Sequence, residues 1–282
     1  MPTNCVYINY KLVKMKITKI IITAGILAFS AFALSAFVNS KKTAGAKVNG
    51  NKGFAVVELF TSEGCSSCPP ADAVVARLQK ESADKPIYIL AYHVDYWNHL
   101  GWKDAFSDPD YSKRQRDYAK TLNISSVYTP QIVVNGKTEF VGSEEGTLRN
   151  AIKTALQKDE SAQLTLTNAQ IAHGVLEVRY DAKDAGNHSV LLLALIQKSA
   201  QSHVKAGENS GRMLAHVQIV QKLKTFALSN NKTGNESINL PNEFAPQNWE
   251  VIGLIQNTAT GEILAASKAA FSPNNTALKN AE

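Results

Sequence analysis

From residue 54 onward, short continuous runs of apolar residues alternate with segments in which apolar residues recur at helical spacing. Phe54–Phe60 is apolar except for Glu58, and Pro86–His93 is the next such run. Runs of this kind are typical of strands that are buried on both faces of a sheet. Between them, apolar residues from Ala71 to Leu78 recur at the spacing of one helix face. The pattern predicts two parallel strands joined by a helix through a right-handed crossover.

The following segments continue this pattern with two more helices and a hairpin. Pro109–Leu122 and Gly146–Gln157 carry apolar residues at helical spacing. Between them, a short β-branched run begins at a proline, which is tolerated at the head of a strand, and ends at Asn135-Gly136. Asn-Gly is the strongest short signal for a hairpin turn. The order of elements predicts an α/β domain over residues 53–160.

From residue 161 onward the pattern changes to short strands separated by Gly, Asn and Asp turns. Six strands are expected: Gln163–Thr167, Val175–Tyr180, Ser189–Ile196, Ala215–Val220, Glu250–Ile255 and Ile263–Phe271. Thr260-Gly261 predicts a hairpin between the last two. Short strands at this spacing are typical of a β-sandwich. We therefore predict a small β-sandwich domain over residues 161–275, followed by a tail over 276–282.

The first 52 residues differ from the rest of the chain in charge and hydropathy. They hold eight lysines and no acidic residue, so the remaining chain carries a net charge of −2 although the whole carries +6. This balance predicts no nucleic-acid binding. Four of the lysines precede the apolar run Ile20–Val38, a pattern typical of a secretory signal, with Met15 as an alternative to Met1 as the start.

We predict a signal peptide or N-terminal membrane anchor over residues 1–40 and a linker over 41–52. The apolar run is long enough to span a bilayer if it is not cleaved. The protein is therefore expected to be exported, to be periplasmic or secreted, and to contact a membrane only through an uncleaved N-terminal segment.

Cys65 and Cys68 are the cysteines that export would deliver to an oxidising compartment, because Cys5 precedes the apolar run. Residues three apart can close a small disulfide ring. At the start of a helix, free backbone N–H groups and the macrodipole lower the pKa of a thiol. We expect Cys65 to be the attacking thiolate and Cys68 to resolve the mixed disulfide.

Other interpretations of the Cys pair stay open at this point. Structural zinc requires four Cys or His ligands, and the chain has no second Cys pair, so we predict neither a bound metal nor a cofactor. The two thiols and His93 could form a soft copper site in a copper-delivery protein. A third alternative is a binding module in which the Cys65–Cys68 disulfide is only structural and the sandwich is the working part.

Three motifs resemble one family of exported bacterial thioredoxin-like proteins with no assigned function. They are Glu58–Asp72 (ELFTSEGCSSCPPAD), His93–Trp97 (HVDYW) and Tyr128–Gln131 (YTPQ). The resemblance is specific over about residues 54–157 and looser beyond them. It implies a thioredoxin-like α/β domain in which the bond between Thr129 and Pro130 is cis and lies against the disulfide. The Thr129 backbone would then bind an extended substrate strand.

The same resemblance implies a role for Glu58, the one charged residue of the first predicted strand. In thioredoxins, an acid in this strand lies under the disulfide and exchanges a proton with the second cysteine. Burial raises the pKa of a carboxyl and suits it to act as a base. We therefore predict that Glu58 relays protons for Cys68; the alternative is a strand-end side chain that reaches water.

Polar and aromatic residues follow the second predicted strand. His93, Asp95, Trp97 and His99 lie at the sheet edge where ligands gather in open α/β folds. We predict that His93, Asp95 and Trp97 contact the substrate. The alternative is a polar loop in which Trp97 and Trp102 pack for structural reasons.

A second segment that resembles the family lies far along the chain. Lys205–Arg212 (KAGENSGR) with His216 could bind an anion, contact the first domain or form an ordinary loop. Taken together, these features predict an exported thiol–disulfide oxidoreductase. Its partners would be protein or small-molecule thiols and disulfides, together with a redox partner that recycles the Cys pair.

Overall fold

The computed structural model describes residues 53–271 apart from 161, 229–231, 243 and 270. The predicted signal or anchor segment, the linker up to residue 52 and the C-terminal tail lie outside these residues. The described residues belong to one compact unit. Within them, no helix is both long enough and apolar enough to cross a membrane.

The first half of the described chain forms a strand–helix–strand unit, a hairpin and three further helices. Its elements are β1 (Ala55–Thr61), α2 (Pro69–Glu81), β2 (Ile87–His93), the 3₁₀ helix η2 (Asp95–Leu100), α3 (Pro109–Thr121), β3 (Gln131–Val134), β4 (Thr138–Val141) and α4 (Glu145–Leu156). β1 pairs in parallel with β2 and antiparallel with β3, which pairs with β4. The predicted order of elements over residues 53–160 is confirmed.

The second half consists of strands and one short 3₁₀ helix. Its elements are β5 (Gln163–Ala172), β6 (Val175–Lys183), β7 (Ser189–His203), β8 (Met213–Ala227), β9 (Thr233–Asn239), η3 (Pro246–Asn248), β10 (Trp249–Asn257) and β11 (Ile263–Ala269). Four of these strands extend the first sheet to the order β11-β10-β7-β8-β2-β1-β3-β4, while β5-β6-β9 forms a small antiparallel sheet. Strands from both predicted ranges therefore join one mixed sheet, across a parallel contact between Ala91 of β2 and Ile219 of β8.

The apolar run in β7 explains why this strand lies inside the large sheet. Leu191, Leu193 and Leu195 pack in a core with the small sheet. Leu192, Ala194 and Ile196 point to the opposite face and pack with aromatic residues near β1 and α3. Because successive side chains of a strand point to opposite faces, a strand that is apolar at every position needs a core on both sides. The sandwich-like packing is thus limited to the small sheet and the strands that it covers.

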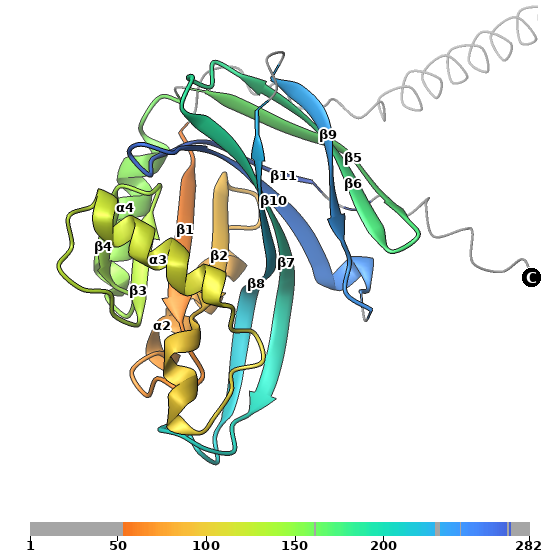
Figure 1. The fold of residues 1–282 in the computed structure, drawn as a ribbon. Coiled ribbons are helices and arrows are strands. Elements are labelled where there is room, and N and C mark those ends of the chain that lie inside the picture. Colours follow the sequence, from red (N-terminus) through yellow and green to blue (C-terminus); the bar gives the residue numbers. More distant parts are fainter. Residues whose placement is uncertain (1–52, 161, 229–231, 243, 270, 272–282) are drawn as a thin grey trace, which may run out of the picture. The chain divides into compact units, whose positions relative to one another are not determined.

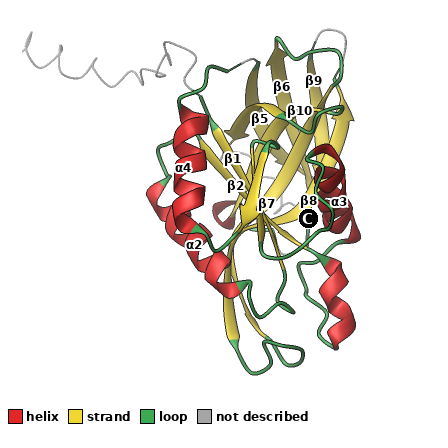
Figure 2. Ribbon diagram, turned by 90° about the vertical axis from the view of Figure 1, so that its left-hand side faces the viewer, coloured by secondary structure: helices red, strands yellow, loops and turns green. Residues whose placement is uncertain are grey.

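The helices cover opposite faces of the first four strands (Figure 2). α2 and α4 lie on one side and α3 on the other. Val57 and Leu59 of β1 pack in the core with α2 and α4, whereas Val56 and Phe60 pack with α3. Alternation along the strand places Glu58 with the second group. The alternation of side chains along β1 therefore directs Glu58 toward α3 and away from α2.

The hairpin signals are confirmed, but several strand predictions need correction. Asn135 and Gly136 both have positive φ (49° and 67°), as the predicted turn requires. β7 and β8 each have 15 residues, longer than predicted, and β9 was not predicted at all. In β9, Ile238 is the fully buried apolar residue, so its sequence TGNESIN carries too little apolar periodicity to indicate a strand.

The extra length of β7 and β8 forms an arm that runs past the other strands (Figure 1). In this arm, pairs from Ser199–Val217 to His203–Met213 hold the two strands together.

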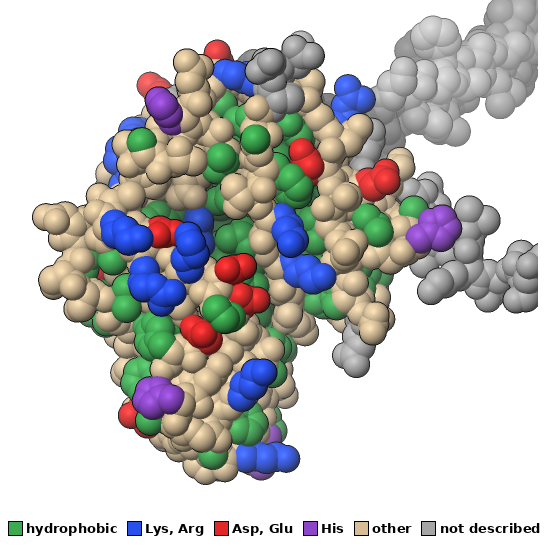
Figure 3. All heavy atoms as spheres, viewed as in Figure 1, with side chains coloured by type: hydrophobic (Ala, Val, Ile, Leu, Met, Phe, Trp, Pro, Cys, Tyr) green, Lys and Arg blue, Asp and Glu red, His purple; other side chains and the backbone are tan. Residues whose placement is uncertain are grey.

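The face of the molecule in Figure 3 shows Lys and Arg side chains beside Asp and Glu side chains. Charges of both signs are mixed across that face.

Candidate functional site

The Cys pair lies at the beginning of α2 and forms a disulfide. Cys68 is the N-cap residue, Pro69 and Pro70 open the helix, and the Cα atoms of Cys65 and Cys68 are 5.4 Å apart. Proline fits this position because the first helical N–H groups lack intrahelical partners. Both cysteine side chains are buried, with 0% exposure.

The backbone groups around Cys65 differ from the expectation that free helical N–H groups point at its sulfur. The first two helical residues are prolines and have no N–H, and the N–H of Ala71 donates to the carbonyl oxygen of Cys68 (2.9 Å). The polar neighbour of the Cys65 sulfur is instead the Ser67 hydroxyl, at 3.3 Å. Local stabilisation of a Cys65 thiolate would therefore come from this hydroxyl as well as from the helix dipole.

The tip of the β7–β8 arm covers the Cys pair. The Asn209 side chain donates to the carbonyl oxygens of Glu63 and Cys65, both at 2.9 Å, and is itself buried. The Ser66 N–H donates to Glu208 Oε2 (2.9 Å). Among the alternatives for Lys205–Arg212, the structure thus shows a contact with the first half of the chain.

The bond between Thr129 and Pro130 is cis, as expected from the resemblance, and lies close to the loop between the two cysteines. The Ser67 hydroxyl is 3.5 Å from the Thr129 carbonyl oxygen. A Cβ atom on Gly142 would lie 3.1 Å from Ala71 Cβ and 3.1 Å from Pro130 Cβ, so the absence of a side chain lets the proline approach α2. The Trp97 indole N–H donates to Thr129 Oγ1 (2.8 Å) and fixes this residue.

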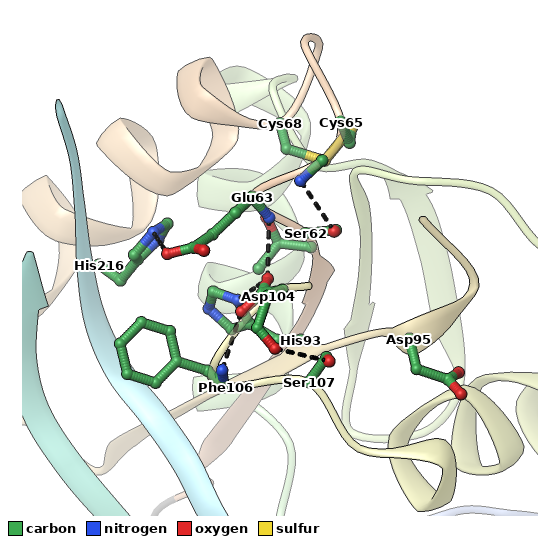
Figure 4. Close-up of polar contacts among 12 residues, drawn as sticks. Ser62, Glu63, Cys65, Cys68, His93, Asp95, Asp104, Phe106, Ser107 and His216 are labelled. Atoms are coloured by element: carbon green, nitrogen blue, oxygen red, sulfur yellow. Dashed lines mark hydrogen bonds and ion pairs between the residues drawn. A yellow bond between two sulfur atoms is a disulfide. The ribbon is translucent and has the colours of Figure 1, made fainter. Parts of the chain in front are cut away.

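Behind the loop that carries Cys65 lies a buried pair formed by His93 and Asp104 (Figure 4). His93 Nδ1 and Asp104 Oδ2 are 2.7 Å apart, and the Glu63 N–H donates to the same oxygen at 2.9 Å. Burial lowers the pKa of His93, but the charge and hydrogen bond of Asp104, together with the charges of Asp72 and Glu63, outweigh it and leave the pKa above its ordinary value. Burial raises the pKa of Asp104, but the charge and hydrogen bond of His93, together with the backbone N–H groups of Glu63 and Phe106, bring it below its ordinary value.

His216, from β8, lies between two further buried carboxylates. Its Nε2 is 3.4 Å from Glu63 Oε1 and its Nδ1 is 3.8 Å from Asp72 Oδ2. Its ring is also 4.7 Å from the ring of His93, at 83°. Burial raises the pKa of Asp72 above its ordinary value, although His216 and His93 act in the opposite direction. We call Glu63, Asp72, His93, Asp104 and His216 the acid–histidine cluster.

Polar atoms without partners concentrate in this cluster. Among the described residues, seven buried side-chain N or O atoms have no hydrogen-bond partner, and four of them are Glu63 Oε1, His93 Nε2 and the two ring nitrogens of His216. Glu63 Oε2 accepts from the Trp102 indole N–H (2.7 Å). Buried polar groups are normally paired, so such a concentration calls for a chemical explanation. In the described part of the chain, no three His, Cys, Asp or Glu residues are placed to hold a metal ion.

Glu58 belongs to a different site, and its predicted role needs correction. Its Oε1 accepts from Arg114 Nε at 2.7 Å, and its Oε2 accepts from the Tyr118 hydroxyl. Both partners come from α3, on the face of β1 opposite to α2. Because a charged side chain in this position meets a cation from α3, Glu58 is held as part of an ion pair and is not directed toward Cys68.

Of the substrate-binding residues that the sequence suggested, the structure gathers Trp97, Thr129 and Pro130 near the Cys pair. His93 is fully buried in the acid–histidine cluster. Asp95 points away from the cluster (Figure 4) and accepts from the Ser112 hydroxyl of α3. The prediction that Asp95 contacts the substrate therefore has no geometric support here.

Sequence reasoning missed Glu63, Asp72 and Asp104 as site residues. Two of them, Glu63 and Asp72, lie inside the motif that carried the resemblance. A signal was present for Asp72 in the sequence, because this acid lies three residues before Val75 and so falls on the apolar face of the predicted helix. For Asp104 the sequence offers no such signal, since it lies in a polar loop, whereas Asn209 belongs to the Lys205–Arg212 segment that resembles the family.

The fold and the site define a mixed α/β protein with a disulfide at a helix start, next to a buried acid–histidine cluster. The chain belongs to the family described as "Protein of unknown function (DUF1223)", whose model matches residues 56–256. This family description names no activity, so the function has to be inferred from the site.

The chain is also similar to a crystal structure of a protein from Agrobacterium tumefaciens. The two share 25% sequence identity with a TM-score of 0.60, and the match covers 76% of this chain and 92% of that one. Two structures of a β-glucosidase from Kluyveromyces marxianus match with a TM-score of 0.20, 11% and 13% identity, 39% and 48% of this chain and 14% and 18% of theirs. That similarity is too low to carry an argument. No protein with a curated description matches.

Proposed function

We propose that this protein is an exported thiol–disulfide oxidoreductase that acts through Cys65 and Cys68. One observation carries the proposal: the disulfide lies at the start of α2, and Pro130 lies close to the same helix start. A structural disulfide requires neither a helix start nor a neighbouring strand end that can receive a peptide.

The arrangement of the first half of the chain supports a thioredoxin-like unit. A parallel β1-α2-β2 unit is followed by an antiparallel β3-β4 hairpin and α4, in the sheet order β2-β1-β3-β4. In thioredoxin-like proteins the Cys pair follows the first strand in chain order, which corresponds to β1, and the cis-proline precedes the third, which corresponds to β3. Here the corresponding positions are Cys65, Cys68 and Pro130.

The reaction consists of two thiolate–disulfide exchanges. In the reducing direction, the Cys65 thiolate attacks one sulfur of a substrate disulfide and releases the other as a thiolate. The Cys68 thiolate then attacks the Cys65 sulfur, which releases the second substrate thiolate and closes the Cys65–Cys68 disulfide. The substrate gains two electrons and the Cys pair loses two. The oxidising direction is the reverse of these steps.

Access to Cys65 requires a local opening of the cover. Its side chain has no exposed surface, and the tip of the arm contacts the loop through Asn209 and Glu208. The contact with Glu208 lies at the surface, where one hydrogen bond contributes little to stability. Displacement of this tip would expose both the sulfur and the Thr129 carbonyl oxygen. A substrate strand would then bind between the two.

Export and recycling complete the proposal. Export rests on the apolar run Ile20–Val38 and the lysines before it. In an oxidising compartment, a redox partner would keep the Cys pair in its working state. Proteins or small molecules that contain thiols or disulfides are the substrates.

Insulin reduction by the full chain, with dithiothreitol as electron source, tests this function. We expect catalysed precipitation of the insulin B chain, which Cys65→Ser abolishes and Cys68→Ser converts into a trapped mixed disulfide. Titration with copper(I) serves as the parallel assay for the copper-delivery alternative. Tight stoichiometric copper binding without insulin reduction would replace the proposal. Inactivity in both assays would favour a structural disulfide in a binding module.

A further inference from the structure

We propose that Asp72, with His216 and Glu63 around it, is the buried proton-exchange site of Cys68. This inference rests on the proposed function, because it assigns the group that supplies the proton when the disulfide opens. Asp72 would be the residue that exchanges the proton, and His216 would be a positioning residue that acts through it.

The position of Asp72 follows from helix geometry. Asp72 lies four residues after Cys68, and its N–H donates to the Cys68 carbonyl oxygen (3.1 Å). Residues at this spacing share one face of a helix. Cys68 and Asp72 are both buried, so the carboxyl lies on the same inward-facing side of α2 as the sulfur. The Thr61 hydroxyl donates to Asp72 Oδ1 (3.1 Å) and leaves Oδ2 facing His216.

The surroundings of Asp72 allow it to hold and to lose a proton. His216 of β8 and His93 of β2 face it with positive potential, while Asp104 opposes them, and Glu63 lies on the far side of His216. Burial raises the pKa of Asp72 and favours the protonated form. Once the proton is lost, the facing imidazoles stabilise the carboxylate. The two ring nitrogens of His216 face Asp72 and Glu63 without forming a hydrogen bond, so this ring lies between the two carboxylates.

The proton step balances with the electron step. When an incoming thiolate opens the disulfide, Cys68 leaves with an electron pair as a thiolate. That thiolate has no exposed surface, and a buried unpaired charge is costly. Transfer of the Asp72 proton to the Cys68 sulfur yields a neutral thiol and a carboxylate that faces His216. In the closing direction, Asp72 takes the proton back as Cys68 attacks the mixed disulfide.

The first test is the equilibrium of the full-length protein with glutathione redox buffers across pH. Each proton by which reduction of the protein differs from oxidation of glutathione changes the equilibrium constant tenfold per pH unit, which corresponds to about 30 mV. In the wild type we expect the pH dependence to change across the titration of Asp72. Asp72→Asn should remove this change, and Glu139→Gln, which alters a half-buried carboxylate bonded to Tyr128 and Gln131, should retain it.

The second test separates the two chemical steps by stopped flow. Asp72→Asn should slow closure of the disulfide by Cys68 by about 10²-fold at neutral pH, because general-base assistance is lost. The attack of Cys65 on substrate should stay unchanged. His216→Gln should slow the same step and shift its pH profile. If both variants close the disulfide at the wild-type rate, Asp72 has no role in proton exchange.

Redox-induced infrared difference spectra of the wild-type protein give a measurement that needs no variant. We expect a protonated-carboxyl band that disappears on reduction as Asp72 ionises. The absence of any carboxyl change would overturn the inference while glutathione exchange continues to support the proposed function. Stoichiometric zinc uptake that depends on His216 would also overturn it, by assigning the cluster to a metal. If the wild type fails to exchange with glutathione at all, both proposals fail.

Discussion

Glu58 and Glu63 are two carboxylates that lie close in sequence and are both fully buried, yet their surroundings differ. Glu58 meets Arg114 and Tyr118 and has hydrogen bonds to both of its oxygens. Glu63 has one oxygen paired with Trp102, while the other faces His216 without a hydrogen bond. Both carboxylate oxygens of Glu58 are hydrogen-bonded, whereas only one oxygen of Glu63 is.

This difference teaches that burial of an acid does not by itself indicate a chemical role. A fully paired carboxylate–guanidinium site holds the structure in one arrangement, since each charge depends on the other. A cluster with unpartnered nitrogen and oxygen atoms retains the capacity to bind or move a proton. The four predictions that follow test this comparison.

The largest effect is expected from Arg114→Met. This change leaves the Glu58 carboxylate buried without its cation, which costs about 3–5 kcal/mol of unfolding free energy. Urea unfolding monitored by circular dichroism measures the loss. Arg77→Met is the matched control, because Arg77 forms its ion pair with Glu145 at the surface and should lose at most about 1 kcal/mol. Similar losses in both variants would contradict the view that Glu58 is a structural anion.

The next effect is expected from Asn209→Ala in the arm. The variant loses both hydrogen bonds to the carbonyl oxygens of Glu63 and Cys65, and we expect a loss of about 1–3 kcal/mol. Exchange of the disulfide with glutathione should also become faster, because the cover opens more often. Ser210→Ala removes one exposed bond to the Lys205 carbonyl and serves as the control. An unchanged exchange rate in Asn209→Ala would show that the arm does not limit access.

A smaller effect is expected from Glu63→Gln, and it sharpens the comparison directly. Glutamine retains an acceptor for Trp102 and removes the charge that faces His216, so stability should change by less than about 1 kcal/mol. Glu58→Gln, the same substitution at the satisfied site, should lose about 1.5–3 kcal/mol because a charged hydrogen bond to Arg114 is weakened. Equal losses of unfolding free energy in the two variants would show that Glu63, like Glu58, serves to stabilise the fold.

The smallest effect is the pH dependence of stability due to Asp72. Burial raises the pKa of Asp72 above 3.8. The stability that the protonated Asp72 contributes to the folded state is therefore fully present below pH 3.8 and is lost as the pH rises through the raised pKa. Asp72→Asn should therefore gain stability relative to the wild type as the pH rises. His93 also has a raised pKa, so its contribution to stability is likewise lost as the pH rises above 6.5. The Asp72→Asn variant retains His93 and therefore retains this loss. Urea unfolding between about pH 4 and pH 8 measures the difference. A constant difference across this range speaks against a titrating Asp72.

Much of the local structure could be predicted from the sequence, because local patterns decide it. The apolar run of β1, the helix face of α2 and the Asn135-Gly136 turn each follow from neighbouring residues. The position of the Cys pair at a helix start is likewise a local property of strand, loop and two prolines. These features required no knowledge of which segments meet in space.

The sequence also determined that β7 needs a core on both faces, since its apolar run leaves no polar side. It could not determine that this strand and its neighbours would extend the first sheet through β2 and β8. Strand partners are chosen by packing over long sequence separations, and a periodic pattern contains no record of them.

The role of the two carboxylates was decided in the same way by tertiary structure. Sequence alone marked Glu58, because a charge in an apolar strand is conspicuous. Only the fold brings Arg114 from α3 to Glu58 and His216 from β8 to Glu63. The energy of a buried charge depends on which opposite charges surround it within a few ångströms. Those neighbours are supplied by elements distant in sequence, so the chemistry of this site became visible only in the folded chain.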